Sequence, residues 1–220
     1  MPAKFTLNGD TIDERRFKAM KEDRSAVHIM SLVDEHQQEE SHAFTNDGEL
    51  DEFARHHPRL KDSFKAAKHG RDVVRRHLAA MTDEQLSAYR DALDAMATAT
   101  DPALERMIAA MFPGGSPERD GLKAFLGPKS GTVEFFDYTS YGRKFHSAAG
   151  MFHLPMPYLG SWDNHLSSLR LYGPVSIQLF DGPAFTGSSR IYGAWPFQTR
   201  SISLSGDWFN NRTSSWLFHM

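Results

Sequence analysis

The sequence predicts an α + β protein of two domains, an N-terminal helical bundle followed by an all-β antiparallel sandwich. Residues 1–130 carry 19 Lys and Arg against 23 Asp and Glu, whereas residues 131–220 carry 6 against 5. Apolar residues recur at helical spacing in the first part and alternate with polar residues in short runs in the second. Pro and Gly punctuate the stretch between them, "FPGGSPERDG". We therefore expect a helical domain over 1–115, a linker over 116–130 and a β domain over 131–220.

The N-terminal part begins with a strand signal and then a helix signal. "KFTLNGD" predicts a short strand that ends in the turn Asn8-Gly9. Thr11 and Glu14 have the spacing of a capping box, which predicts the start of a helix. Apolar residues from Ile12 to Val33 recur at helical spacing, so the first helix is expected to reach about residue 42.

Three further helices are expected before the linker. A second amphipathic run covers residues 60–81, with an interruption expected at Gly70. Thr82 and Gln85 form a capping box for a third helix, and Asp101-Pro102 opens a fourth, short helix with Pro at its first position.

The C-terminal part contains five short runs rich in β-branched and aromatic residues, each bounded by Gly, Pro or Asp. These runs are 132–138, 166–172, 175–181, 200–206 and 214–219. Short strands at such spacing within one domain are typical of an antiparallel sandwich or barrel.

Two motifs in the C-terminal part each occur twice. The first is a pair of Asx residues, two variable residues and two serines, and we call its copies the signature loops. They are Asp163-Asn164-x-x-Ser167-Ser168 and Asn210-Asn211-x-x-Ser214-Ser215. The second motif is an aromatic-Asp pair followed by an aromatic-Gly hairpin. Its copies are Phe136-Asp137-x-x-x-Tyr141-Gly142 and Phe180-Asp181-x-x-x-Phe185-x-Gly187.

This layout resembles the βγ-crystallin family. Greek-key units of about forty residues in that family carry an aromatic-x4-aromatic-x-Gly hairpin and, in calcium-binding members, the sequence N/D-N/D-x-x-S/T-S. The resemblance covers 131–220 and implies two Greek-key motifs, 131–173 and 174–220. The first hairpin departs from the family pattern, because Gly142 follows Tyr141 with no residue between them.

The resemblance implies two calcium ions, each held by one signature loop and the first hairpin of the other motif. One site would use Asn164, the backbone carbonyl of His165, Ser167 and Asp181. The other would use Asn211, the backbone carbonyl of Arg212, Ser214 and Asp137. Supporting hydrogen bonds would come from Asp163, Ser168, Asn210 and Ser215.

The chemistry of these residues suits calcium, which takes oxygen ligands from carboxylates, carbonyls, hydroxyls and water. One carboxylate for each ion is fewer than a high-affinity EF-hand loop provides, so we expect micromolar to sub-millimolar binding. The alternative is that these Asx and Ser residues form turns without an ion, as they commonly do.

Other sites have little support. "FTNDGELDEF" is not an EF-hand, because placing Gly48 at loop position six puts Ala43 and Ala54 at the two essential carboxylate positions. We interpret it as a turn with a helix N-cap. The chain has no Cys, and no pair of His residues shows the H-E-x-x-H pattern of a zinc site.

The helical domain is expected to serve protein interaction or self-association, and no catalytic motif is present. The alternatives are an enzyme or a toxin-like effector activity within 1–115, with the β domain as a scaffold, and a proteinase inhibitor.

No nucleic acid or membrane partner is expected, because the formal net charge is only -3. Residues 55–77 are locally basic, and we interpret them as packing beside the acidic residues 78–112. No apolar run reaches the roughly 18 residues needed to span a bilayer, and the N-terminus has no apolar signal-peptide segment. The chain is expected to be soluble, and cytoplasmic by default.

Overall fold

The computed structural model describes residues 4–33, 38–58, 60–87, 131–149, 159, 163–194, 196 and 198–219. The predicted linker and the predicted fourth helix lie outside these ranges. No helix within them combines the length and the apolar composition needed to cross a membrane.

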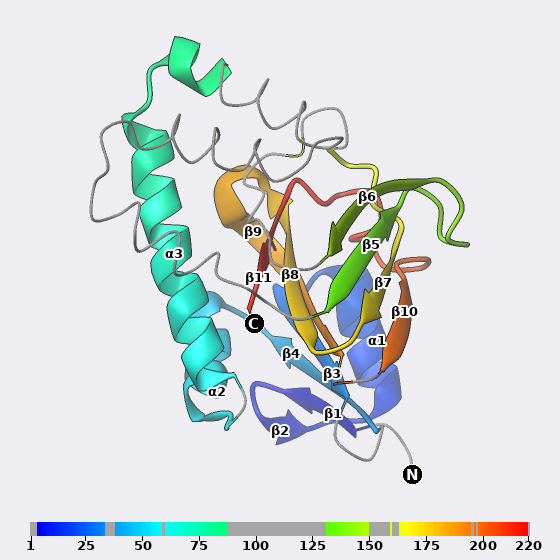
Figure 1. Cartoon of the computed structure of the whole chain (residues 1–220). Helices are drawn as coiled ribbons and strands as arrows, with labels where there is room; N and C mark the ends of the chain where they lie inside the picture. The colour runs from blue at the N-terminus through cyan, green and yellow to red at the C-terminus, as the bar shows by residue number, and fades with distance from the viewer. Residues whose placement is uncertain are drawn as a thin grey trace.

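A seven-stranded sheet combines strands from both ends of the chain (Figure 1). Its order is β11-β8-β9-β3-β4-β1-β2. The strands are β1 (Lys4–Leu7), β2 (Asp10–Thr11), β3 (His28–Val33), β4 (Glu39–Phe44), β8 (Val175–Gly182), β9 (Thr186–Ala194) and β11 (Ser215–Phe218). β3 runs parallel to β9 and β1 parallel to β4, whereas the other neighbours are antiparallel. The sheet therefore draws strands from both predicted domains.

A second, four-stranded sheet contains only C-terminal strands, all antiparallel, in the order β10-β7-β5-β6. They are β5 (Thr132–Phe136), β6 (Lys144–Ala149), β7 (Ser168–Tyr172) and β10 (Thr199–Ser203). The five runs predicted as strands are confirmed as β5, β7, β8, β10 and β11. β6 and β9 were not predicted, because their Gly, Ser and Ala residues weaken the strand pattern.

The prediction of an N-terminal helical bundle is wrong for residues 28–33 and 39–44, which form two strands. The expected helix to residue 42 is only α1 (Glu14–Asp23), and β3 and β4 follow it. β3 is paired on both edges, and all of its residues except Val33 are buried. A strand buried on both faces is apolar nearly throughout, so its residues also satisfied the helical spacing.

Three turn and cap predictions are confirmed. β1 ends at the Asn8-Gly9 turn and pairs with β2. Asn46 caps α2 (Asp47–His56) by accepting a hydrogen bond from the Glu49 backbone N–H, which is the N-cap expected instead of an EF-hand. Thr82 and Gln85 exchange the two hydrogen bonds of a capping box.

Two helix predictions need correction. α1 begins two residues later than a cap at Thr11 implies, because Asp13 is its N-cap and accepts from the Arg16 backbone N–H at 2.8 Å. α3 (Lys61–Ala80) continues through Gly70 without a break. Gly70 is buried, so tertiary packing outweighs the low helix propensity of glycine there.

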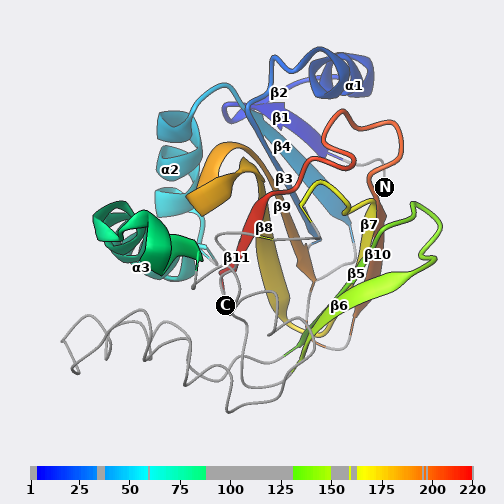
Figure 2. The same cartoon turned by 90° about the horizontal axis from the view of Figure 1, so that it is seen from above.

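The elements form layers around the seven-stranded sheet. Figure 2 shows α2 and α3 on one side of this sheet and the four-stranded sheet on the other. α3 is tied to the short 3-10 turn η2 (Pro183–Phe185), because Arg75 donates to the carbonyls of Ala184 and Phe185. The largest core cluster joins side chains of α3 and of both sheets, including Val74, Leu78, Phe135, Leu169, Leu179 and Trp216.

A buried ion pair anchors the segment before the second signature loop. Arg190 on β9 donates to both carboxylate oxygens of Asp207, at 3.0 and 3.1 Å, and their side chains are 0% and 2% exposed. The guanidinium also lies over the rings of Trp208 and Phe209. Lys21 of α1 approaches Asp207 to 3.5 Å. Burial by itself would raise the pKa of Asp207, but hydrogen bonds and charge from Arg190 outweigh it and hold the pKa below its usual value.

We expect Asp207→Asn to lower the free energy of unfolding by about 3 kcal/mol, because it leaves the buried guanidinium of Arg190 without its counter-charge. Urea unfolding at neutral pH measures this change. Lys18→Gln is the control, since it removes an exposed pair with Glu14 and is expected to cost less than about 0.5 kcal/mol. Similar costs for the two variants would contradict the anchoring role of Asp207.

Candidate functional site

Both signature loops lead directly into strands. Ser168 begins β7 opposite Phe136, and Ser215 begins β11 opposite Phe180. The preceding serine of each loop, Ser167 or Ser214, donates its backbone N–H to the carbonyl of Phe136 or Phe180, at 2.9 and 2.8 Å. Each loop therefore lies beside the end of the first strand of its own motif.

The two signature loops also cross and bond to each other. The backbone N–H of Asn164 donates to the carbonyl of Thr213, and that of Asn211 donates to the carbonyl of Leu166, both at 3.0 Å. Both asparagines have positive φ, 61° and 55°. Asn enters this left-handed region more readily than most residues because its short polar side chain bonds locally.

The structure brings together side chains that the sequence analysis assigned to different ions. Ser167 Oγ donates to Asn211 Oδ1 at 2.5 Å. Within the first loop, Asn164 Nδ2 donates to Asp163 Oδ2 at 3.1 Å. The side chain of His165 is exposed, as is that of Arg212.

The last serine of each signature loop braces the hairpin of its own motif. Ser168 Oγ donates to the carbonyl of Tyr138 at 2.5 Å, and Ser215 Oγ donates to that of Gly182 at 2.7 Å. Ser215 Oγ also accepts from the backbone N–H of Phe185. These hydrogen bonds fix the hairpins relative to the loops.

The two hairpins have the same aromatic geometry despite the missing spacer in the first. Phe136 and Tyr141 meet edge to face at 5.7 Å, and Phe180 and Phe185 do so at 5.9 Å. The second aromatic residue has positive φ in both hairpins, 59° and 61°. The aromatic pair therefore keeps its contact and its backbone conformation in both hairpins, although the glycine comes one residue earlier in the first.

The two hairpin carboxylates differ in their partners. Asp137 Oδ2 accepts from Arg143 Nε at 2.6 Å, while its Oδ1 is buried and has no hydrogen-bond partner among the described residues. In the second hairpin the position that corresponds to Arg143 is Gly187. Burial raises the pKa of Asp181, although the Ser188 backbone N–H bonds to it and Arg190 lies near enough to oppose the shift.

Donor chemistry at the loops fits a hard cation such as calcium. Asn210 Oδ1 is a second buried oxygen that has no partner in the described part of the chain. These carboxylate, amide and hydroxyl oxygens are of the types that calcium prefers. No group of three or more His, Cys, Asp or Glu side chains in the described ranges is arranged to hold a metal ion.

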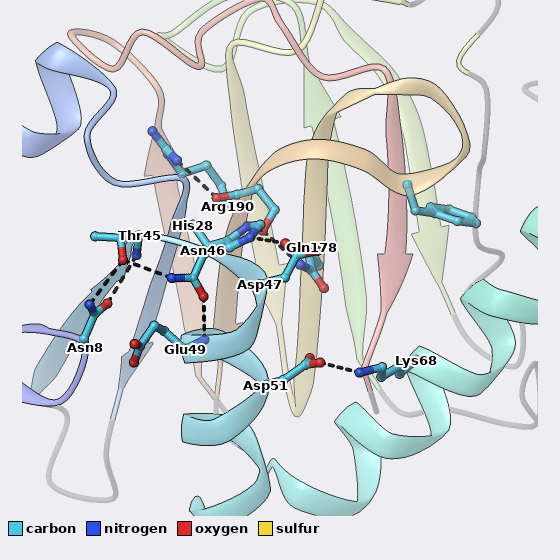
Figure 3. Close-up of polar contacts among 12 residues, drawn as sticks. Asn8, His28, Thr45, Asn46, Asp47, Glu49, Asp51, Lys68, Gln178 and Arg190 are labelled. Atoms are coloured by element: carbon cyan, nitrogen blue, oxygen red, sulfur yellow. Dashed lines mark hydrogen bonds and ion pairs between the residues drawn. The ribbon is translucent and has the colours of Figure 1, made fainter.

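A different polar constellation, missed by the sequence analysis, joins five side chains across the seven-stranded sheet. We call it the polar relay, and Figure 3 shows part of it at the start of α2. Its members are Asp47, His28, Ser189, Gln178 and His219. The distances are 2.6 Å from Asp47 Oδ1 to His28 Nε2, 2.8 Å from His28 Nδ1 to Ser189 Oγ, 2.9 Å from Ser189 Oγ to Gln178 Nε2 and 2.9 Å from Gln178 Oε1 to His219 Nε2.

The polar relay contains the residue types of a Ser-His-Asp triad but does not present a nucleophile. Ser189 is fully buried, and its hydroxyl also accepts from Gln178. A hollow of about 490 Å³ lies between α2 and α3, and an apolar one of about 250 Å³ lies near Leu32 and Val175. Neither hollow is lined by a member of the polar relay or of a signature loop.

No protein-family model and no curated protein matches the sequence. Among solved structures, a βγ-crystallin from an archaeon is similar to 40% of this chain over 98% of its own length, with 17% identity and a TM-score of 0.33. A structure on the evolution of the eye-lens βγ-crystallin domain fold is similar to 42% of this chain over 88% of its own length, with 14% identity and a TM-score of 0.33. A mutant βγ-crystallin domain from Clostridium beijerinckii is similar to 41% over 98% of its length, with 17% identity and a TM-score of 0.29. These likenesses are to the family that the repeated motifs resemble.

The glycine of the second hairpin gives a matched test of how tightly the Asp181 carboxylate is held. Gly187 and Gly206 both have positive φ, 78° and 73°, so an alanine is strained at either position. A Cβ at Gly187 would also collide with Asp181 Oδ1, whereas one at Gly206 meets nothing within 4 Å. We expect Gly187→Ala to lower the melting temperature more than Gly206→Ala. Equal losses would show that Asp181 moves aside freely.

Proposed function

We propose that this protein binds calcium through the two crossed signature loops, and that two ions stabilise its C-terminal β strands. The observation that carries the proposal is the 2.5 Å contact between Ser167 Oγ and Asn211 Oδ1, together with Asp137 Oδ1, which is buried and has no hydrogen-bond partner among the described residues. Buried oxygens without partners are costly, and a cation would satisfy them. The two-motif Greek-key interpretation of 131–220 is part of this proposal.

The ligand assignment follows the crossing of the loops. We keep the pairing of Asp137 with Asn211 and of Asp181 with Asn164, in accord with the sequence analysis. The serines are reassigned, because Ser167 bonds to Asn211 and lies beside Phe136, next to Asp137. Ser214 lies beside Phe180 in the same way, and therefore joins Asp181. The backbone carbonyls of the variable loop residues complete the ligands available to each ion.

The helical segments of 1–115 are proposed, more generally, to serve a protein partner or self-association. Within the described ranges, Tyr138 is the one large apolar side chain that is exposed, and it belongs to the first hairpin. The partner therefore has no assigned surface.

Calorimetric titration of calcium into chelator-stripped full-length protein tests the proposal, with a thermal melt alongside. We expect two binding events and a raised melting temperature, because a ligand at about one hundred times its Kd adds about 2.7 kcal/mol for each independent site. Asp10→Asn changes an exposed carboxylate on β2 and should leave both events intact. If calcium produces no binding heat and no change in melting temperature, the Asx and Ser residues only form turns and the proposal fails.

Single and double variants decide which serine serves which ion. If the reassigned ligands are right, Asp137→Asn and Ser167→Ala remove the same binding event, and the double variant loses no more than either single variant. Asp181→Asn and Ser214→Ala then remove the other event. If Asp137→Asn instead shares its event with Ser214→Ala, the arrangement implied by the family resemblance holds and the reassignment fails.

The partly buried carboxylate of Asp181 yields a prediction about the calcium-free protein. Because burial raises its pKa, the ionised form is disfavoured, and the folded state loses stability as the pH rises through the raised pKa. We expect Asp181→Asn to unfold at a higher urea concentration than wild type at pH 7 with chelator present. With calcium, the variant should lose the increase in melting temperature that one of the two ions provides. Calcium affinity at this site should fall as the pH is lowered toward the raised pKa, because protons compete with the ion. A destabilised calcium-free Asp181→Asn would contradict this account.

A further inference from the structure

The polar relay lies at the seam between the N-terminal strands and the C-terminal strands of the large sheet. β3 and β9 pair in parallel over four residue pairs, and His28 opposite Ser189 is the first of them. Asp47 is the first residue of α2. Gln178 lies on β8, and His219 directly follows β11. The polar relay therefore connects α2 and β3 to three C-terminal segments.

One set of protonation states satisfies all four contacts of the polar relay. His219 Nε2–H donates to Gln178 Oε1, and Gln178 Nε2 donates to Ser189 Oγ. Ser189 then donates to His28 Nδ1, and His28 Nε2–H donates to the carboxylate of Asp47. Every donor points the same way, and the series ends at an anion that only accepts. This arrangement requires a neutral His28, because Nδ1 must be an acceptor.

A proton added to His28 Nδ1 removes that acceptor. The new N–H points at Ser189 Oγ, which already accepts from Gln178, and the hydroxyl proton of Ser189 loses its partner. Ser189 is fully buried and has no access to water as a substitute. A buried donor without a partner costs roughly 1 to 3 kcal/mol.

We propose that the polar relay is a proton-sensitive joint, in which protonation of His28 reverses its hydrogen bond with Ser189 and loosens the pairing of β3 with β9 in mild acid.

The groups that face His28 support this assignment. Burial lowers the pKa of His28, and the positive charges of Arg71 on α3 and Arg190 on β9 act in the same direction. Asp47, from α2, opposes the shift without cancelling it. Phe44, opposite His28 on β4, is apolar. Because the folded-state pKa is lowered, the stabilising effect of neutral His28 is complete above about pH 6.5 and declines as the pH falls below that value.

A second polar contact at the same seam does not depend on histidine. Arg200 of β10 donates to the carbonyls of Ser31 and Gly193 and to the carboxylate of Glu39. Acid should therefore act first at the His28 end of β3 and leave the Ser31 end paired.

His42 on β4 provides a matched control. It is also buried, and burial lowers its pKa to about 4. Its Nδ1 bonds to Thr6 on β1, so its protonation acts on the pairing of β1 with β4, away from β9. Loss of stability in acid therefore has two expected sources, and only a local measurement separates them.

Amide hydrogen exchange at pH 7.5 and pH 5.0 tests whether acid loosens the pairing of β3 with β9. The rates are corrected for intrinsic exchange, and chelator is present so that calcium has no effect. In wild type we expect the amides of β9 and the first half of β3 to open more readily at pH 5.0, by up to about 30-fold. His28→Gln, which cannot be protonated in this range, should show less than about a threefold change at those amides. His42→Gln should retain the wild-type response there. An equal acid response in wild type and His28→Gln would overturn the proposal.

A second measurement keeps the test decisive if His28→Gln does not fold. The histidine ring resonances of wild type, assigned through the backbone, give the titration midpoint of His28 directly. A midpoint below 6.5 together with acid-enhanced opening at β9 supports the joint. A midpoint at or above 6.5, or no enhanced opening, overturns it.

Discussion

The parallel pairing of β3 with β9 is the contact on which the rest of this structure depends. It supplies partners for the backbone groups of β9 on the side away from β8, which would otherwise form an open sheet edge. It also attaches β4, β1 and β2, so that residues from the start of the chain complete a sheet whose other strands come from its end. A division of the chain into a helical part and a β part does not describe this sheet.

Charged and polar side chains strengthen the β3–β9 seam where the backbone pairing alone is short. Arg200 reaches from the smaller sheet to the carbonyls of Ser31 on β3 and Gly193 on β9, and Arg190 of β9 forms a fully buried pair with Asp207, which ties β9 to the segment after β10. A buried charge is tolerated only when its partner is in place, so these contacts specify one arrangement of the strands. The polar relay differs from them because one of its members, His28, is a histidine that gains a proton only in mild acid, since burial lowers its pKa.

The hairpins illustrate how one fold element can carry two different electrostatic environments. Arg143 in the first hairpin and Gly187 in the second stand at corresponding positions, each six residues after its aspartate. The guanidinium neutralises Asp137, whereas Asp181 is partly buried and has only backbone hydrogen bonds and more distant arginines. In the proposed calcium sites, the first ion would compete with an arginine and the second with a proton.

The sequence by itself determined the local features of this protein. Strand runs with period two, the capping box at Thr82, the N-cap at Asn46 and the repeated hairpin and signature motifs are encoded within a few residues, because caps, turns and aromatic pairs depend on near neighbours. The tertiary structure alone decided where those elements pair. The apolar spacing of residues 28–33 predicted a helix, and these residues form a strand because β4 and β9 provide hydrogen bonds on both of its edges. The crossing of the loops and the relay from Asp47 to His219 join residues far apart in the chain, and no local pattern specifies contacts that arise only when distant strands become neighbours.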